Sequence, residues 1–160
     1  MILSEFYAIV RSMSHILYGH DAEYFARTKG EIYLRLGHEV TVCETASECL
    51  EAVARVGHKI DVAVIHKDIG EIFKEGIGID DITQALRNQQ EQLIRLVIIS
   101  GEAYSGKEYV ITLGADAYFH TNLEAENPWL LGQFNAGLVS PKELGQRGIR
   151  VATPMEFKER

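Results

Sequence analysis

Five polar residues that could do chemistry lie at the ends of apolar stretches of the chain. They are His20, Asp21, His66, Asp68 and Ser100. Imidazole and carboxylate groups are suitable ligands for Zn²⁺ or Fe²⁺, and an imidazole or a hydroxyl can act as a nucleophile. No sequence signature places a histidine as a base beside Ser100, so this hydroxyl is expected to form hydrogen bonds at a strand end. The candidate chemistries are therefore metal binding by the histidines and aspartates, and phosphoryl transfer to His66.

The stretch 60–66 is the centre of the predicted fold. It is short, rich in β-branched residues and followed by a turn signal at 67–70, which is typical of a strand buried on both faces. In open α/β sheets, ligands bind just beyond the carboxyl ends of such strands. His66 stands at this end and is therefore the first residue to consider for function.

The rest of the chain alternates strands with helices. This alternation predicts an α/β fold with a doubly wound, five-stranded parallel sheet and helices on both faces. The loop 67–78 is longer than the connection requires, which is typical of a site or a partner surface. The predicted strands are 15–19, 39–43, 60–66, 95–100 and 117–119, and the predicted helices are 22–36, from 46, from 79 or 80 to 89, 103–113 and from 128.

Two terminal segments lie outside this alternation. Residues 1–14 are expected to form an N-terminal extension, residues 15–139 the domain, and residues 140–160 a C-terminal appendage. Within the appendage, Ser140 and Pro141 are typical of a helix start, and residues 149–153 could form a short strand.

Composition and charge exclude several classes of function. The chain has 160 residues, of which 46% are hydrophobic, so it can bury a sizeable core. No apolar run reaches the roughly 18 residues of a membrane span, and the net charge of −7 disfavours binding to nucleic acid. The two cysteines, Cys43 and Cys49, and the absence of a leader-like N-terminus predict reduced thiols in a cytoplasmic protein without membrane association.

A family resemblance rests on residues 36–40, on the strand ends at 66 and 100, and above all on the sequence Gly-Ala-Asp-Ala-Tyr at 114–118. In these features, residues 15–138 resemble the receiver domain of two-component response regulators. The resemblance implies a flavodoxin-like fold with strand order 2-1-3-4-5 and a role in signal transduction.

The residues that receivers use for phosphorylation are mostly replaced. In that family two acidic residues end the first strand, an Asp that accepts the phosphoryl group ends the third, a Ser or Thr ends the fourth, and Lys-Pro ends the fifth. Of this family pattern, the present chain keeps only an acidic residue at the first strand and a hydroxyl at the fourth. Asp68 stands where receivers offer only a backbone carbonyl to the metal. The corresponding positions here are His20 and Asp21, His66, Ser100, and Thr121 followed by Asn122.

An aspartyl phosphate requires a carboxylate nucleophile, Mg²⁺ held by oxygen ligands, and a Lys that pairs with the product. None of the three is intact here. The resemblance therefore implies a degenerate pseudo-receiver that lacks the phosphoacceptor Asp, a catalytic residue, a metal and a cofactor. It would act through a protein partner or a second copy of the chain. Two alternatives remain open, namely phosphorylation of His66 and a small metal-dependent α/β enzyme built on the histidines and aspartates named above.

A partner surface is predicted on the helix 103–113 and the elements after it. Tyr104 and Ile111 are seven residues apart and project together, away from the stripe that packs on the sheet. Receivers commonly interact through the fourth helix, fifth strand and fifth helix, which adds Tyr118 and Trp129 to this surface. The alternative is that residues 1–12 or the tail after Ser140 fold back and cover these side chains.

Overall fold

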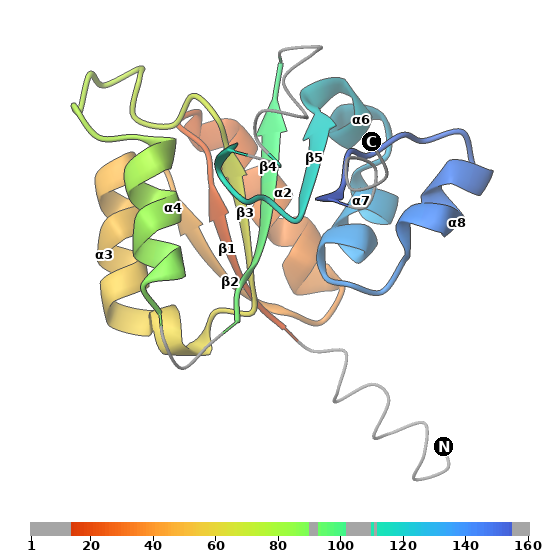
Figure 1. Cartoon of the computed structure of the whole chain (residues 1–160), viewed down its shortest axis with the longest axis horizontal. Coiled ribbons are helices and arrows are strands. Elements are labelled where there is room, and N and C mark those ends of the chain that lie inside the picture. Colours follow the sequence, from red (N-terminus) through yellow and green to blue (C-terminus); the bar gives the residue numbers. More distant parts are fainter. Residues whose placement is uncertain (1–13, 90–92, 102–109, 111, 155–160) are drawn as a thin grey trace, which may run out of the picture.

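A computed structural model describes residues 14–89, 93–101, 110 and 112–154 of the chain. Five parallel strands form one sheet in the order β2-β1-β3-β4-β5 (Figure 1). This architecture confirms the predicted flavodoxin-like fold. The strands are β1 (His15–Gly19), β2 (Glu39–Cys43), β3 (Val62–His66), β4 (Arg95–Ser100) and β5 (Ala117–His120).

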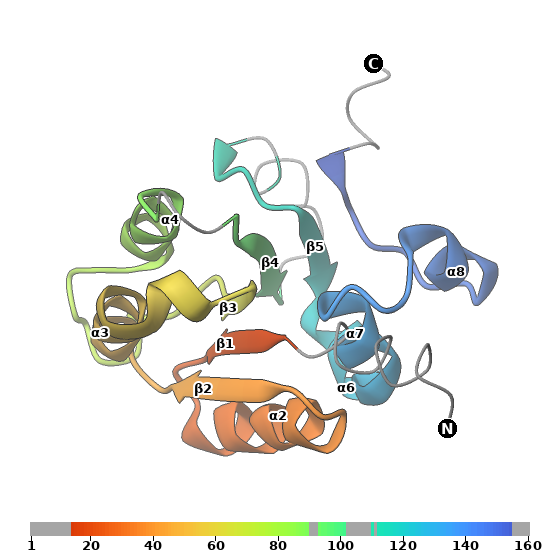
Figure 2. The ribbon, with the colours of Figure 1, turned by 90° about the horizontal axis from the view of Figure 1, so that it is seen from below.

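Helices cover both faces of the sheet (Figure 2). α3 and α4 pack on one face, and α2, α7 and α8 contribute to the core on the other. The described helices are α2 (Glu23–Arg35), α3 (Ala46–Val56), the 3₁₀ turn η1 (Gly57–Lys59), α4 (Ile79–Arg87), α6 (Thr121–Glu126), α7 (Pro128–Asn135) and α8 (Pro141–Gln146).

The two-sided burial of the central strands explains their continuous apolar sequence. Leu17 of β1 belongs to the core beneath α3 and α4, whereas its neighbours Ile16 and Tyr18 belong to the core on the opposite face. Every residue of β3 is buried, including the terminal His66. Because side chains alternate between the faces of a strand, a strand covered by helices on both sides needs apolar residues at nearly every position.

The last helices differ from the sequence prediction. The segment between β5 and Pro128 forms the short helix α6, which the pattern did not predict. The helix that begins at Pro128, α7, ends at Asn135, and Leu138 beyond it is 43% exposed. Gly137 adopts φ +83°, a left-handed conformation that ends a helix and that glycine adopts without strain. The predicted helix 103–113 lies largely outside the described residues.

The segment after α7 packs against the domain. Its helix α8 begins at Ser140, whose hydroxyl accepts a hydrogen bond from the N–H of Glu143 at 3.1 Å. Leu144 is fully buried in the core beside α7. The expected strand at 149–153 is reduced to one antiparallel bridge, in which Ala152 and Tyr118 exchange two backbone hydrogen bonds of 2.9 Å. In the described ranges, no helix has the length and apolar character needed to cross a bilayer.

Candidate functional site

The candidate site lies at the carboxyl ends of the central strands. His66 ends β3, which lies between β1 and β4 in the sheet, and its side chain is only 8% exposed. Its Nε2 lies 3.0 Å from the hydroxyl oxygen of Tyr18, and its ring centroid lies 3.7 Å from that of His20. The sequence therefore predicted correctly that His66 lies at the carboxyl ends of the strands. The structure adds that its imidazole is enclosed in a hydrogen-bonded cluster.

Glu124 of α6 completes this cluster. Its carboxylate accepts a hydrogen bond from the Tyr18 hydroxyl, with its two oxygens at 3.0 and 2.9 Å, and Oε1 lies 3.5 Å from Nε2 of His66. Since the Tyr18 hydroxyl has one proton and donates it to Glu124, Nε2 of His66 must be the donor to the Tyr18 oxygen. Burial, followed by the charge of Glu124, holds the pKa of Tyr18 well above its usual range. The result is a directed chain of hydrogen bonds from His66 through Tyr18 to Glu124.

The sequence reasoning missed Glu124. A glutamate in a short polar segment is usually solvated, and no spacing rule connects it to a tyrosine that lies 106 residues earlier. The segment 121–126 could be identified only as a stretch between β5 and the Asn127-Pro128 helix start. Burial of the carboxylate depends on its tertiary partners, which the local pattern does not contain.

His20 lies at the mouth of the cluster. Its Nδ1 accepts a hydrogen bond from the N–H of Ala22 at 3.0 Å, and its ring stacks on Phe25 with the centroids 5.6 Å apart. Burial and, secondarily, the neighbouring His66 lower the pKa of His20 to about 4. His20 is therefore a neutral hydrogen-bond acceptor at neutral pH and adds no positive charge to the site.

Asp21 serves the loop after β3. Its Oδ2 accepts hydrogen bonds from the backbone N–H groups of Gly70 at 2.9 Å and Ile72 at 3.3 Å, and Asp21 is buried. Gly70 has φ +94°, and a Cβ at this position would lie 2.1 Å from the carbonyl oxygen of Ile77. The loop conformation therefore requires this glycine. The one acidic residue retained at the first strand thus orders the loop 67–78.

The metal alternative required Asp21 and Asp68 to converge with the histidines, and the structure contradicts that arrangement. The side chain of Asp68 is 58% exposed, and its Oδ1 lies 3.5 Å from Nζ of Lys67. Among the described residues, no three His, Cys, Asp or Glu side chains form a group that could hold a metal ion. Ser100 is buried at the end of β4, and Thr121 is half-buried.

A pocket of about 310 Å³ opens beside the cluster. The cation of Lys29 belongs to it, and Nζ of this residue donates to the backbone carbonyl of Glu124 at 3.4 Å. Thr121, which the sequence resemblance predicts to stand at the position of the receiver lysine, also lines the pocket and offers only a hydroxyl. The complete lining consists of His20, Phe25, Lys29, His66, Thr121, Asn122, Glu124 and Ala125.

The predicted partner surface needs one correction. Tyr118 is only 6% exposed, and its backbone is paired with Ala152, so it does not belong to an exposed surface. Trp129 is 45% exposed, as the surface requires. Tyr104 and Ile111 lie outside the described residues.

The comparisons with known proteins identify the fold. No family model matches the chain, and no curated protein matches it. The structure is similar to a Francisella response regulator receiver domain, with a TM-score of 0.61, 17% identity, and coverage of 78% of this chain and 97% of that one. It is also similar to a CheY-like receiver domain from Methanospirillum hungatei JF-1, with a TM-score of 0.60, 17% identity, and coverage of 85% and 99%. The chain has the receiver fold.

A third similar structure contains a phosphorylated residue. It is a response regulator from Burkholderia pseudomallei with a phosphorylated aspartic acid, a calcium ion and citrate. Its TM-score is 0.58 at 21% identity, and the match covers 83% of this chain and 74% of that one. At identities this low, the structural similarity establishes only the shared fold. The function has to be argued from the residues of this chain.

Proposed function

We propose that the chain is a pseudo-receiver domain that acts in signal transduction through contacts with a protein partner, independently of aspartyl phosphorylation. The observation that carries the proposal is the state of His66. It occupies the end of β3, where the receiver pattern has the phosphoacceptor Asp, and it is buried in the hydrogen-bonded chain with Tyr18 and Glu124.

The electrostatics of this cluster oppose a phosphoryl group. A buried carboxylate, Glu124, lies 3.5 Å from the imidazole. Lys29 lines the same pocket, but its Nζ donates to the backbone carbonyl of Glu124, and Thr121 supplies no cation where receivers have a lysine. The negative charges of a phosphoryl group and of Glu124 would repel each other, and such repulsion costs several kcal/mol at short distances where water is largely excluded. The retained Asp21 uses one carboxylate oxygen for the amides of Gly70 and Ile72, which reduces its capacity to hold Mg²⁺.

Phosphorylation of His66 itself is also disfavoured. A histidine nucleophile attacks with the lone pair of an unprotonated nitrogen, and Nε2 of His66 carries the proton that it donates to Tyr18, so only Nδ1 has a lone pair for attack. The side chain is also only 8% exposed, which limits its access to a phosphoryl donor. The domain is accordingly proposed to be a non-catalytic cytoplasmic protein without a cofactor, whose output depends on its partner.

Treatment with acetyl phosphate, or with beryllium fluoride and Mg²⁺, tests this proposal. The mass of the protein and its NMR amide shifts should stay unchanged, while a receiver with an intact acceptor Asp serves as the positive control. Treatment with phosphoramidate examines His66 in the same way. Mg²⁺-dependent shifts around Asp21, or a phosphorylated protein, would contradict the proposal.

The partner surface is proposed to be centred on Trp129, together with Tyr104 and Ile111 of the sequence-predicted segment 103–113. Large exposed apolar side chains that gather on one face are typical of an interaction surface. The exposed Trp129 supports this placement. Either a two-fold pair of chains or a different protein could bury it, and the oligomeric state distinguishes these cases.

A further inference from the structure

The outer edge of β2 is open. β2 is the first strand of the sheet, and β1 is its one neighbour among the described strands. The carbonyl of Cys43 accepts a hydrogen bond from the N–H of His20 at 3.0 Å, so the backbone of Cys43 faces β1. Because successive residues of a strand direct their backbone groups to opposite sides, the N–H and C=O groups of Val42 and Val40 point away from the sheet.

The same alternation directs the backbone N–H of Glu44 outward, and a side chain of the chain itself satisfies it. This N–H donates to Oε2 of Glu48 at 2.7 Å. The outward N–H and C=O groups of Val40 and Val42 form no hydrogen bond with any residue that the structure describes. A row of free backbone donors and acceptors on an edge strand is the template onto which another extended chain pairs.

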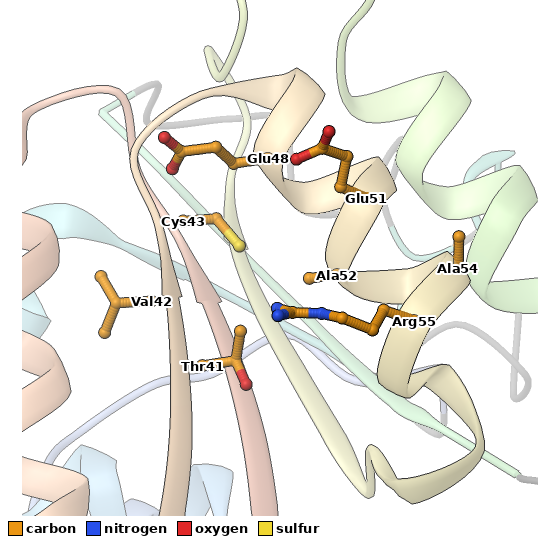
Figure 3. A pocket seen from close by; sticks show the side chains of 8 residues that line it. All are labelled: Thr41, Val42, Cys43, Glu48, Glu51, Ala52, Ala54 and Arg55. Carbon is orange, nitrogen blue, oxygen red and sulfur yellow. The ribbon is translucent and has the colours of Figure 1, made fainter.

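A groove of about 660 Å³ runs between this edge and α3 (Figure 3). Figure 3 shows Thr41 and Cys43 on the side of β2 that faces the groove, with Val42 on the other side of the strand. Ala52 on the strand side of α3 is small, which leaves room beside the strand. The groove is lined by Thr41, Val42, Cys43, Glu48, Glu51, Ala52, Ala54 and Arg55.

Side chains of opposite charge lie at different positions along this groove. The guanidinium of Arg55 reaches from α3 towards Thr41, near the middle of β2, whereas Glu48 and Glu51 lie nearer the carboxyl end of the strand (Figure 3). Neither Glu51 nor Arg55 has an ion-pair partner within the described ranges. The groove therefore offers an unpaired positive group and, one turn of α3 away, an unpaired negative one.

We infer that the β2 edge binds an extended peptide segment of a partner protein. The segment pairs antiparallel with β2, because antiparallel pairs are more stable per residue. A basic side chain faces Glu48 and Glu51, and an acidic side chain two residues later faces Arg55. This site is separate from the His66 cluster and does not rest on the function proposed above.

A second copy of the chain fits the edge less well. The outward groups of Val40 and Val42 are symmetric about Thr41, so a two-fold pair of β2 strands would have its axis at Thr41. Such a pair would bring Arg55 towards its own equivalent, and like charges across an interface suppress association. Charge complementarity thus favours a different chain with alternating charge.

The test uses a fluorescein-labelled peptide, Thr-Val-Lys-Val-Glu-Val-Thr, and the full chain in a fluorescence anisotropy titration. The control peptide, Thr-Val-Glu-Val-Lys-Val-Thr, has the same composition with the charges exchanged. The first peptide should bind about tenfold more tightly than the control, and N-methylation of its last two valines should abolish binding. Equal binding of both peptides, tighter binding of the control, or no binding of either would overturn the inference.

Three variants locate the site. Val42→Pro removes one outward N–H and should weaken peptide binding about tenfold, whereas Val42→Ala keeps this N–H and should bind nearly as the natural chain does. Arg55→Glu should shift the preference to a peptide with Lys at both charged positions. Equal binding by the two Val42 variants would overturn the inference. Light scattering that finds a dimer in the natural chain and a monomer in Val42→Pro would assign the edge to a second copy and would also overturn it.

Discussion

The carboxylate of Glu124 and the phenol of Tyr18 are joined by a buried hydrogen bond of 2.9 Å, although 106 positions separate them in the sequence. The bond attaches α6 to the first strand and places Glu124 beside His66 in the lining of the pocket. The carboxylate of Glu124 also gives the pocket a negative charge.

Substitution of Glu124 by Ala should lower the free energy of unfolding by about 2 to 3 kcal/mol. The buried Tyr18 hydroxyl loses its acceptor, and the removed side chain leaves a void. Urea unfolding at pH 7 measures the effect. Glu126→Ala, an exposed position on the same helix, is the control and should change stability by no more than about 0.5 kcal/mol. Similar small losses for both variants would mean that the hydrogen-bonded chain contributes little.

Substitution of His66 by Asp should not restore phosphorylation by acetyl phosphate, because Glu124 and Thr121 remain in place. The new carboxylate would lie beside Glu124, so one of the two would be protonated and its pKa raised. A raised carboxyl pKa means that stability is lost as the pH increases. His66→Asp should therefore be less stable than the neutral control His66→Asn at pH 8, by about 1 to 3 kcal/mol, with a smaller difference at pH 5. Phosphorylation of His66→Asp, detected by mass spectrometry, would contradict this expectation.

His20 should make the folded state sensitive to acid. Its pKa is lowered from 6.5 to about 4, mainly by burial, so the unfolded chain binds a proton in this range more readily than the folded chain does. Stability is unaffected above pH 6.5 and falls as the pH decreases from about 6.5 to 4. After allowance for partial exposure, the loss should be about 2 kcal/mol.

The variant His20→Asn isolates this effect. Asn keeps an acceptor for the N–H of Ala22 and does not titrate. Buried His38, whose pKa burial also lowers, is common to both proteins and cancels in the comparison. Parallel stability curves for the two proteins between pH 7 and pH 4 would show that His20 is not the sensitive group.

Two glycine-to-alanine substitutions in helices should have opposite signs. Gly145 in α8 has open space around a potential Cβ, so Gly145→Ala should stabilise the protein by about 0.5 kcal/mol through helix propensity. At Gly30 in α2, a Cβ would lie 2.6 Å from Cγ2 of Val42, so Gly30→Ala should destabilise it by about 1 to 3 kcal/mol. Thermal unfolding of both variants checks the prediction, which fails if Gly30→Ala is as stable as the natural chain.

Substitution of Trp129 by Glu should reduce self-association or partner binding without loss of stability, because the side chain is 45% exposed. Leu93→Glu is the matched control, since Leu93 is 93% exposed. It lies just before β4, at the end of the sheet opposite the carboxyl ends of the strands. Light scattering measures the oligomeric state, and calorimetry measures the stability. If both variants behave alike, the region around Trp129 is not a specific surface.

The sequence by itself determined the secondary structure of the sheet and most of its helices. Alternating apolar runs, the capping sequence at Thr45, whose hydroxyl accepts the N–H of Glu48 at 3.0 Å, and the glycine after α2 are local signals. The family resemblance added the strand order, which the structure confirms. These features were predictable because they depend on residues that are neighbours in the chain.

Only the tertiary structure decided what the strand ends do. It directed Asp21 to the amides of Gly70 and Ile72, exposed Asp68, and buried Glu124 against Tyr18 and His66. It also buried Tyr118 and paired its backbone with Ala152. Whether a carboxylate, an imidazole or an aromatic ring is solvated or buried depends on groups brought together from distant parts of the chain, and their free energies of desolvation and hydrogen bonding cannot be read from local sequence.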